Sequence, residues 1–280
     1  MKFKVFAKIN LSLNVLTLEQ EGYHMLDAVN QSISMYDTVT VMPRADKLCK
    51  VFCDKDIGVI NTALTAANRF VKTFDTNGYD IYLEKGIPMA GGLGGSSADA
   101  AGVLAALSKL NGISLGEAGK IADDVGSDVK YMMTGGLARV GGRGEKVQSV
   151  ECDSVLYFVI ATPPFGMSTQ RVFQQFDFSP DFTKTDNDKL IQAVLNEDVA
   201  AVKLNLYNGL QQAAFSVDDR LKKFFDKLKK FGFVSMSGSG SSMFFVCADK
   251  FESGFLLKQL EKEKIKAFCV ESKNYGIEYI

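Results

Sequence analysis

A glycine-rich stretch that runs directly into a helix-forming segment is the strongest chemical signal in this sequence. Residues 88–98 read PMAGGLGGSSA, and the Ala/Leu-rich residues that follow predict a helix over 97–110. Glycine lets backbone N–H groups approach a ligand closely and adopt positive φ without strain. The first N–H groups of a helix are unpaired and carry about half a positive charge. Together these features predict an anion site, typically one for phosphate.

Two common nucleotide motifs do not fit this stretch. It lacks the G-x-x-x-x-G-K-[ST] pattern of a Walker A loop, and it lacks G-x-G-x-x-G in register after a strand. A dinucleotide-binding fold is therefore disfavoured. The structural alternative is a turn whose small residues serve only close packing.

Composition bounds the class of protein. The chain has 280 residues, 46% of them hydrophobic and 23% charged, with a formal net charge of −1, which is globular composition. The charge disfavours nucleic acid as a partner, because nucleic-acid-binding domains are usually basic. The sequence contains no window of 18 apolar residues, so no membrane span is predicted. The N-terminal residues alternate polar and apolar, which favours a half-buried strand over a signal peptide, so we expect a cytoplasmic protein.

The cysteines and the single histidine do not predict a metal site. There are five cysteines, and the spacing of Cys49 and Cys53 fits no zinc pattern. His24 cannot complete one alone. We expect reduced and mostly buried thiols.

The glycine-rich stretch must be positioned by the surrounding elements. The patterns predict strands over 3–16, 28–43 and 79–85, a hairpin within 135–147, and strands over 155–164, 233–247 and 265–274. They predict helices over 61–74, capped by Asn61 or Thr62, and over 115–124, 189–196, 200–215, 218–231 and 251–262. Strands and helices mix without strict alternation, which indicates an α+β protein of two layers. The apolar strand that ends in Pro163 and Pro164 predicts a boundary between domains 1–150 and 151–280.

Three motifs in order resemble those of the galactokinase, homoserine kinase, mevalonate kinase and phosphomevalonate kinase (GHMP) superfamily. They are AKINLSLNV at 7–15, PMAGGLGGSSADAA at 88–101 and MSGSGSSMFFV at 236–246. The resemblance implies an N-terminal, ATP-binding domain like domain 2 of ribosomal protein S5 and a C-terminal ferredoxin-like domain. It also implies an active site in the cleft between them, with ATP and Mg²⁺ as cofactors.

Further segments resemble one branch of the superfamily. They are EGYHMLDAVNQSISMYDTVTV at 21–41, GSDVKYMMTGGLARVGGRGEKV at 126–147 and PPFGMSTQRVFQQF at 163–176. That branch phosphorylates the 2-hydroxyl of 4-diphosphocytidyl-2-C-methyl-D-erythritol in non-mevalonate isoprenoid precursor biosynthesis. A mevalonate- or homoserine-type kinase is the nearest alternative, but those substrates carry no base. A non-catalytic binding protein of the same fold is the other.

The resemblance assigns residues to roles. It implies that Lys8 and Asp128 are the catalytic pair, with Lys8 facing the γ-phosphate and Asp128 accepting the proton of the substrate hydroxyl. Taken alone, Lys8 would be a surface strand lysine and Asp128 a helix cap. The implied ATP-binding residues are Pro88, Met89, Ala90, Gly91, Gly92, Leu93, Gly94, Gly95, Ser96, Ser97 and Ala98. The implied substrate-binding residues are Asn10, Tyr23, His24, Thr169, Phe173, Gly238, Ser239 and Gly240. Mg²⁺ would come with ATP near Ser97, not in a cage of protein ligands.

Several positions depart from the pattern of that branch. Asn30 stands where some relatives carry an aromatic residue, Lys130 replaces a proline and Arg139 lies in a usually apolar stretch. The arginine usual before the GYH segment is absent. We expect Lys130 to lower the basicity of Asp128 or to contact phosphate.

Overall fold

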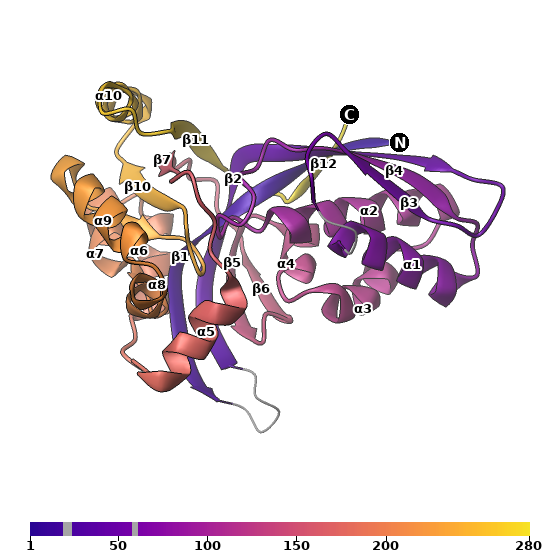
Figure 1. Ribbon diagram of the computed structural model, residues 1–280, viewed down its shortest axis with the longest axis horizontal. Coiled ribbons are helices and arrows are strands. Elements are labelled where there is room, and N and C mark those ends of the chain that lie inside the picture. Colours follow the sequence, from indigo (N-terminus) through magenta and orange to yellow (C-terminus); the bar gives the residue numbers. More distant parts are fainter. Residues whose placement is uncertain (19–23, 58–60) are drawn as a thin grey trace.

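Two long paired strands form the centre of the molecule. The computed structural model describes residues 1–18, 24–57 and 61–280. Strands β1 (Lys2–Leu18) and β2 (His24–Pro43) pair antiparallel from Lys2 opposite Thr40 to Leu18 opposite His24. In Figure 1 this indigo pair runs diagonally through the molecule, so that elements from both halves of the chain pack along it. The predicted strands over 3–16 and 28–43 are confirmed.

The other strands extend this pair into one continuous sheet, whose main path is β12-β1-β2-β11-β7-β10-β9. Beside β1 and β2 lie β3 (Lys50–Cys53), β4 (Tyr79–Glu84), β5 (Leu137–Gly142), β6 (Lys146–Val150), β8 (Tyr207–Asn208) and β12 (Ile277–Tyr279). The remaining strands are β7 (Tyr157–Ala161), β9 (Ser235–Met236), β10 (Met243–Cys247) and β11 (Ala267–Lys273). Strand β12 returns from the end of the chain to pair with β1, and β11 pairs with both β2 and β7.

The four strands β11-β7-β10-β9 are all antiparallel. In chain order they are the fourth, first, third and second strands of a β-α-β-β-α-β unit, as in a ferredoxin-like domain. The predicted α+β class is confirmed. The predicted division near residue 150 falls between β6 and β7 and stays a prediction. The larger hydrophobic core contains residues from both sides of it.

Helices cover both parts of the sheet: the larger part around β1 and β2, and the smaller part formed by β11-β7-β10-β9. Figure 1 shows α1 to α4 grouped against the larger part and α5 to α10 around the smaller one. The first group is α1 (Thr62–Phe74), α2 (Gly95–Asn111), α3 (Leu115–Val125) and α4 (Val129–Thr134). The second group is α5 (Thr169–Phe178), α6 (Asn187–Leu195), α7 (Val199–Asn205), α8 (Gln211–Val217), α9 (Asp219–Leu228) with the 3₁₀ turn Lys229–Phe231, and α10 (Lys250–Lys262).

The helix ends follow the capping residues of the sequence. Asn61 lies in extended backbone before α1, and its side chain accepts a hydrogen bond from the Leu64 N–H at 2.8 Å. Helix α2 ends at Gly112, whose φ of +65° is left-handed. Both predictions are confirmed. Helix α2 begins at Gly95, two residues before the predicted start.

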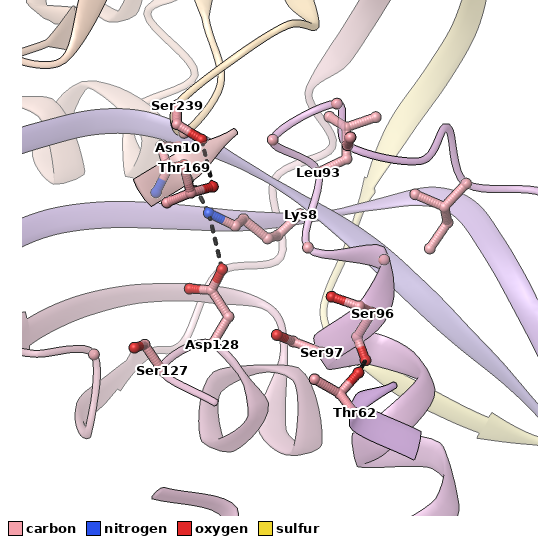
Figure 2. Close-up of a pocket in the computed structure, with 18 of the residues that line it drawn as sticks. Lys8, Asn10, Thr62, Leu93, Ser96, Ser97, Ser127, Asp128, Thr169 and Ser239 are labelled. Carbon is pink, nitrogen blue, oxygen red and sulfur yellow. Dashed lines mark hydrogen bonds and ion pairs between the residues drawn. The ribbon is translucent and has the colours of Figure 1, made fainter. Parts of the chain in front are cut away.

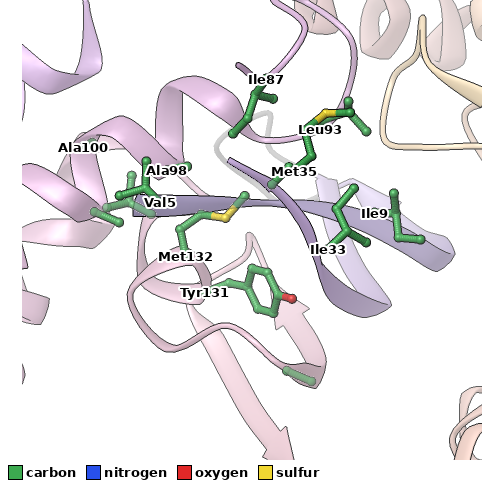
Figure 3. Close-up of a cluster of buried hydrophobic side chains, with 14 of the residues drawn as sticks. Val5, Ile9, Ile33, Met35, Ile87, Leu93, Ala98, Ala100, Tyr131 and Met132 are labelled. Atoms are coloured by element: carbon green, nitrogen blue, oxygen red, sulfur yellow. The ribbon is translucent and has the colours of Figure 1, made fainter. Parts of the chain in front are cut away.

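The glycine-rich stretch rests on the larger hydrophobic core. Leu93 and Ile87 are fully buried and pack with Ile33 and Met35 of β2. Figure 3 shows Leu93 beside Met35, with Met132 and Tyr131 of α4 below the same strands. The core also includes residues of the second half of the chain, such as Phe244. The loop is therefore held from beneath by apolar packing.

From Lys8 to Asn14 the polar face of β1 is buried as well, so the expectation of a half-buried strand is wrong there. The polar residues with little or no exposure are Lys8, Asn10, Ser12 and Asn14. The second half of the chain covers this face, since Ser12 Oγ donates to Asn187 Oδ1 and Asn14 Nδ2 donates to the Thr185 carbonyl. A strand that alternates in sequence thus lies between two layers.

Two predicted elements are wrong. The helix over 200–215 is interrupted by β8, because Asn208 turns the chain: its Nδ2 donates to the Met236 and Gly238 carbonyls and its Oδ1 accepts from Leu210 N–H. The strand over 233–247 is two short strands joined by a loop at 237–242, in which Gly238 and Gly240 have positive φ.

The thiols are free, but the expectation that most are buried is wrong. Cys247 is buried, Cys269 is exposed, and Cys49, Cys53 and Cys152 lie between these extremes. In the described parts of the chain, no helix is long and apolar enough to cross a membrane.

Candidate active site

One cavity brings the predicted site residues together. It has a volume of about 930 Å³ and is lined by residues of both halves of the chain. Predicted residues that line it are Lys8, Asn10, His24, residues 88–97, Asp128, Thr169, Phe173, Gly238 and Ser239. Ala98 and Gly240 do not line it: Ala98 is buried in the larger core, and Gly240 lies against Met236 and Leu221. Tyr23 lies outside the described residues.

The glycine-rich loop is fixed at the start of α2. Gly94 is the N-cap residue, with φ +73°. A Cβ built there would lie 2.0 Å from Met132 Cε and 3.2 Å from Lys8 Cγ. A side chain at this position would be strained by the positive φ and would displace Met132 and Lys8. Gly94 places the first N–H groups of α2 at the edge of the cavity. This is the arrangement that suits a phosphate group.

The loop at 237–242 holds the glycine-rich loop from the other side. Ser237 Oγ donates to the Gly92 carbonyl at 2.9 Å, and the Ser242 N–H donates to the Gly91 carbonyl at 3.0 Å. The Lys8 N–H donates to the Leu93 carbonyl at 3.0 Å. The glycine motifs near residues 91 and 238 are thus bonded to each other, although about 145 residues separate them in sequence.

Lys8 and Asp128 form an ion pair in the middle of the cavity. Lys8 Nζ lies 3.4 Å from Asp128 Oδ2, and Figure 2 shows the two side chains pointing at each other. Lys8 comes from β1 and Asp128 from the residue before α4. Asp128 is the N-cap residue of α4, where the sequence alternative places it, but its carboxylate bonds no N–H of that helix and faces Lys8 instead.

Lys8 has a second partner. Its Nζ donates to Asn10 Oδ1 at 2.7 Å, and Asn10 Nδ2 donates to Asn30 Oδ1 at 2.7 Å. Asn10 and Asn30 are directly opposite each other in the β1–β2 register. A row of polar groups from Asp128 to Asn30 therefore follows the cavity wall.

An aromatic wall lies at the end of the cavity formed by α5. The rings of His24 and Phe173 lie 4.8 Å apart at 36°, and His24 Nε2 is 2.7 Å from Asp177 Oδ1. Thr169 Oγ1 and Ser239 Oγ are 2.8 Å apart, and Figure 2 shows both above Lys8. Predicted substrate-binding residues from three separate segments, at 24, 169–173 and 239, therefore line one part of the cavity.

The sequence reasoning missed a buried charged cluster beside the loop. Lys85 Nζ donates to Asp37 and to Asp99, and all three side chains are almost fully buried. Asp37 Oδ1 accepts from the N–H groups of Gly86 and Ile87, each at 2.7 Å. Burial raises the pKa of the Asp99 carboxyl to about 7; Asp37 acts in the same direction and the Lys85 ammonium opposes them. The cluster ties the residues before the loop to those after it.

Other lining residues were also missed. Among them are Ile57, Asn61, Thr62, Ala63, Lys85, Asp99, Ser127, Arg143, Gln170, Gln174 and Asp177. The sequence predicts Asn61 or Thr62 only as a helix cap, whereas Thr62 Oγ1 donates to the Ser96 carbonyl at 2.6 Å. Asp177 has the one signal that could have found it, namely its place four residues after Phe173 on the same helix.

Two departures from the resembled pattern have structural partners. Lys130 Nζ lies 3.4 Å from Asp123 Oδ2, and Lys130 does not line the cavity. The expected effect of Lys130 on Asp128 or on phosphate therefore has no support in this geometry. Arg139 pairs with both oxygens of Asp27 and also reaches Asp188 of α6.

Oxygen donors for a magnesium ion are sparse. Among the described residues, no three His, Cys, Asp or Glu side chains are placed to hold a metal. Ser97 and Asp128 both line the cavity, and Figure 2 shows the Ser97 hydroxyl on the side of Asp128. Magnesium in nucleotide sites usually keeps several waters and few protein ligands, so these residues fit an ion that arrives with a nucleotide.

Comparison with known proteins agrees with the geometry. The family models of the GHMP kinases N terminal domain and the GHMP kinases C terminal region match residues 61–139 and 190–266. The 4-diphosphocytidyl-2-C-methyl-D-erythritol kinase of Clostridium beijerinckii is 32% identical over 97% of this chain and 100% of its own length. That of Caldicellulosiruptor saccharolyticus is 31% identical over 95% of this chain and 93% of its own.

Solved structures give the same result. A crystal structure of 4-(cytidine 5'-diphospho)-2C-methyl-D-erythritol kinase is 26% identical, with a TM-score of 0.77 over 97% of this chain and 99% of that one. The homoserine kinase of Cytophaga hutchinsonii, at 18% identity and a TM-score of 0.73 over 100% of this chain and 97% of that one, shares the fold. This chain therefore belongs to the GHMP kinases and, within them, to the family of the 4-diphosphocytidyl-2-C-methyl-D-erythritol kinases.

Proposed function

We propose that this protein transfers the γ-phosphoryl group of ATP to the 2-hydroxyl of 4-diphosphocytidyl-2-C-methyl-D-erythritol. The observation that carries the proposal is the place of the Lys8–Asp128 pair. It lies in one cavity between the helix-start loop at 91–95 and the aromatic wall of His24 and Phe173. A donor phosphate and a base-bearing acceptor can therefore meet at this pair.

The loop side of the cavity suits the donor nucleotide. The triphosphate would lie along residues 88–97, which line the cavity up to the first turn of α2. Asn61, Thr62 and Lys85 line the adjoining part of the cavity, where the rest of the nucleotide would extend. Mg²⁺ bound to ATP would neutralise phosphate charge. The Ser97 hydroxyl, which lines the cavity, would be a protein ligand for it.

Lys8 and Asp128 would divide the chemistry. Phosphoryl transfer depends mainly on positioning and charge stabilisation. The Lys8 ammonium has three N–H donors; one bonds Asn10 and Asp128 faces another. The third is left for an oxygen of the transferring group. Asp128, which is more exposed, would orient the substrate hydroxyl and accept its proton.

The aromatic wall suits the cytosine ring of the acceptor. Bases stack on aromatic rings and are read at their edges by hydrogen bonds. His24 Nε2 bonds the Asp177 carboxylate, so the neutral ring carries its proton on Nε2 and leaves Nδ1 as an acceptor. An acceptor is the group that the exocyclic amine of cytosine requires. Thr169, Ser239, Asn10 and Gly238 would contact the substrate between this ring and Lys8.

A coupled assay of ADP release tests the proposal. The acceptor 4-diphosphocytidyl-2-C-methyl-D-erythritol is compared with 2-C-methyl-D-erythritol 4-phosphate, which lacks the cytidylyl group, and with mevalonate and homoserine. We expect turnover with the first and a kcat/KM lower by at least about tenfold with the second. Turnover restricted to mevalonate or homoserine would assign the chain to another GHMP activity. ATP binding without turnover of any acceptor would indicate a non-catalytic protein.

A further inference from the structure

Asn30 is a buried polar residue on the wall of the cavity. It is 1% exposed and lines the cavity, directly opposite Asn10 on the paired strand. Some members of the resembled branch carry an aromatic residue here. Asparagine is expensive to bury unless its amide is bonded, so its presence calls for a polar partner.

The hydrogen-bond directions along this wall are fixed by Lys8. An ammonium can only donate, so the atom of Asn10 at 2.7 Å from Lys8 Nζ must be Oδ1. Asn10 Nδ2 then points at Asn30 and must donate to Oδ1 there, also at 2.7 Å. A flipped amide at either residue would place two donors against each other. Asn30 Oδ1 is therefore the acceptor that keeps Asn10 in the orientation Lys8 requires.

Lys8 needs this support because it is nearly buried. Its side chain is 5% exposed, and the Asp128 oxygen at 3.4 Å is beyond ordinary hydrogen-bond length. The bond to Asn10 is thus the shortest fixed contact of the ammonium among the described residues. The backbone N–H of Asn10 is also bonded, to Ser237 Oγ at 3.3 Å, so the side-chain torsions of Asn10 are what Asn30 controls.

We propose that Asn30 is a positioning residue of this kinase: its carboxamide orients Asn10 and, through Asn10, holds the Lys8 ammonium opposite Asp128. The proposal rests on the proposed function for the reaction in which Lys8 acts. Asn30 acts through another residue and does not need to touch the substrate.

A double-mutant cycle tests this. In the wild-type background, Asn30→Leu leaves Asn10 Nδ2 without an acceptor, and we expect kcat to fall about 5- to 30-fold. The KM for ATP should stay within about twofold. In the Asn10→Ala background there is no amide left to orient, so Asn30→Leu should cause no further loss of kcat. Equal fold-losses in the two backgrounds would overturn the proposal, as would an unchanged kcat in the single variant.

Gln31→Leu is the matched control. Gln31 is the next residue of β2 and is equally buried, but its Nε2 bonds the Ser32 and Lys273 carbonyls away from the cavity. We expect a lower melting temperature with a wild-type kcat. If Asn30→Leu does not fold, Asn30→Ser replaces it in the cycle, since a shorter side chain cannot reach Asn10 Nδ2.

An NMR measurement that needs no turnover tests the role of Asn30 separately from the proposed kinase function. The side-chain amide NMR signal of Asn10 in the substrate-free protein is identified by its absence in Asn10→Ala. It should shift in Asn30→Leu and stay in place in Gln31→Leu. If the wild type phosphorylates none of the acceptors, the proposed function fails, while this shift still supports the Asn30–Asn10 contact. An unmoved signal overturns that contact even in an active enzyme.

Discussion

Lys8 Nζ and Asp128 Oδ2 lie 3.4 Å apart, yet the two side chains differ sharply in exposure, at 5% and 33%. The cation is enclosed by β1 and the glycine-rich loop, whereas the carboxylate opens to the cavity. A substrate hydroxyl can therefore reach Asp128 without displacing protein. The pair is thus a buried cation beside an accessible carboxylate, which suits the proposed role of Asp128 as proton acceptor.

Replacement of Asp128 by asparagine tests that role. Asp128→Asn removes the proposed proton acceptor and keeps the shape of the side chain. We expect kcat to fall about 10²- to 10⁴-fold, with nucleotide affinity within about threefold of wild type. The control is Asp123→Asn, which breaks an ion pair of the same 3.4 Å length between exposed side chains and should change neither value. Steady-state kinetics and calorimetric titration with an ATP analogue give both numbers. A near-normal kcat in Asp128→Asn would remove Asp128 from the mechanism.

Gly94 and Gly112 both have left-handed backbone, so alanine at each position distinguishes the effect of steric crowding from that of backbone strain. At Gly94 a methyl group would meet Met132 and Lys8, whereas at Gly112 it would meet nothing within 4 Å. Gly94→Ala should weaken binding of an ATP analogue by at least about tenfold, because Lys8 and the N–H groups of α2 must shift. Gly112→Ala should lower the free energy of unfolding by ~1–2 kcal/mol from strain alone and leave nucleotide affinity unchanged. Equal affinities in both variants would mean that Gly94 serves packing only.

Local sequence patterns predicted much of this site. The glycine-rich loop, the start of α2 and the Asn61 cap depend on neighbouring residues, so they can be read from short segments. The site residues were assigned through motif resemblance, and their assignments stay predictions until tested. The expectation that distant segments near residues 8, 94, 128 and 238 lie together in one site came from the family resemblance alone.

Contacts between distant segments could not be predicted in the same way. His24 and Asp177 are 153 residues apart, and Asp37 and Lys85 are 48 apart. Their pairing depends on how α5 packs and on the β2–β4 register, which no local periodicity encodes. The interruption at Asn208 was missed for a related reason, since its amide is satisfied by the 236–238 segment and not by its own helix.

The buried cluster of Asp37, Lys85 and Asp99 should make stability depend on pH in an unusual direction. Burial raises the pKa of Asp99 to about 7, from about 4 in an unfolded chain. The folded protein then holds a proton that the unfolded chain has released. This contribution to stability is complete below about pH 4 and is lost as the pH rises through 7. Relative to Asp99→Asn, wild type should therefore lose up to ~1.4 kcal/mol per pH unit across this window.

Urea unfolding of both proteins at several values between pH 5 and 8 measures this difference. Asp27→Asn is the control of opposite sign. Burial raises the pKa of Asp27, but hydrogen bonds from Arg139 and Asn187 outweigh it and lower the pKa overall. The stabilisation from Asp27 is present above the unfolded pKa and is lost only as the pH falls below about 4, so this variant should follow the wild-type slope. Parallel curves for wild type and Asp99→Asn would contradict the assignment.

Phe173 tests the base pocket, because its ring has two possible uses. It lines the cavity beside His24, and it also packs at the edge of the smaller hydrophobic core. If the ring stacks on cytosine, Phe173→Ala should raise the KM for the cytidylyl substrate about 5- to 150-fold, the equivalent of ~1–3 kcal/mol. Phe173→Tyr keeps the π face and should be mild, whereas Phe173→Leu keeps apolar bulk alone and should resemble alanine. ATP affinity should not change in any of them.

If Phe173 serves only to pack the hydrophobic core, its variants should lose stability and not substrate affinity. Phe245 provides a control for that case. Phe245 belongs to the same core, is 2% exposed and does not line the cavity. Phe245→Leu should lower the melting temperature and leave both KM values unchanged, because only packing is lost. If Phe173→Leu behaves like Phe245→Leu, with reduced stability and an unchanged KM for the cytidylyl substrate, the stacking role is wrong. A raised KM with a smaller loss of stability than in Phe245→Leu places the ring against the base, since a half-buried side chain at the core edge loses less packing than a fully buried one.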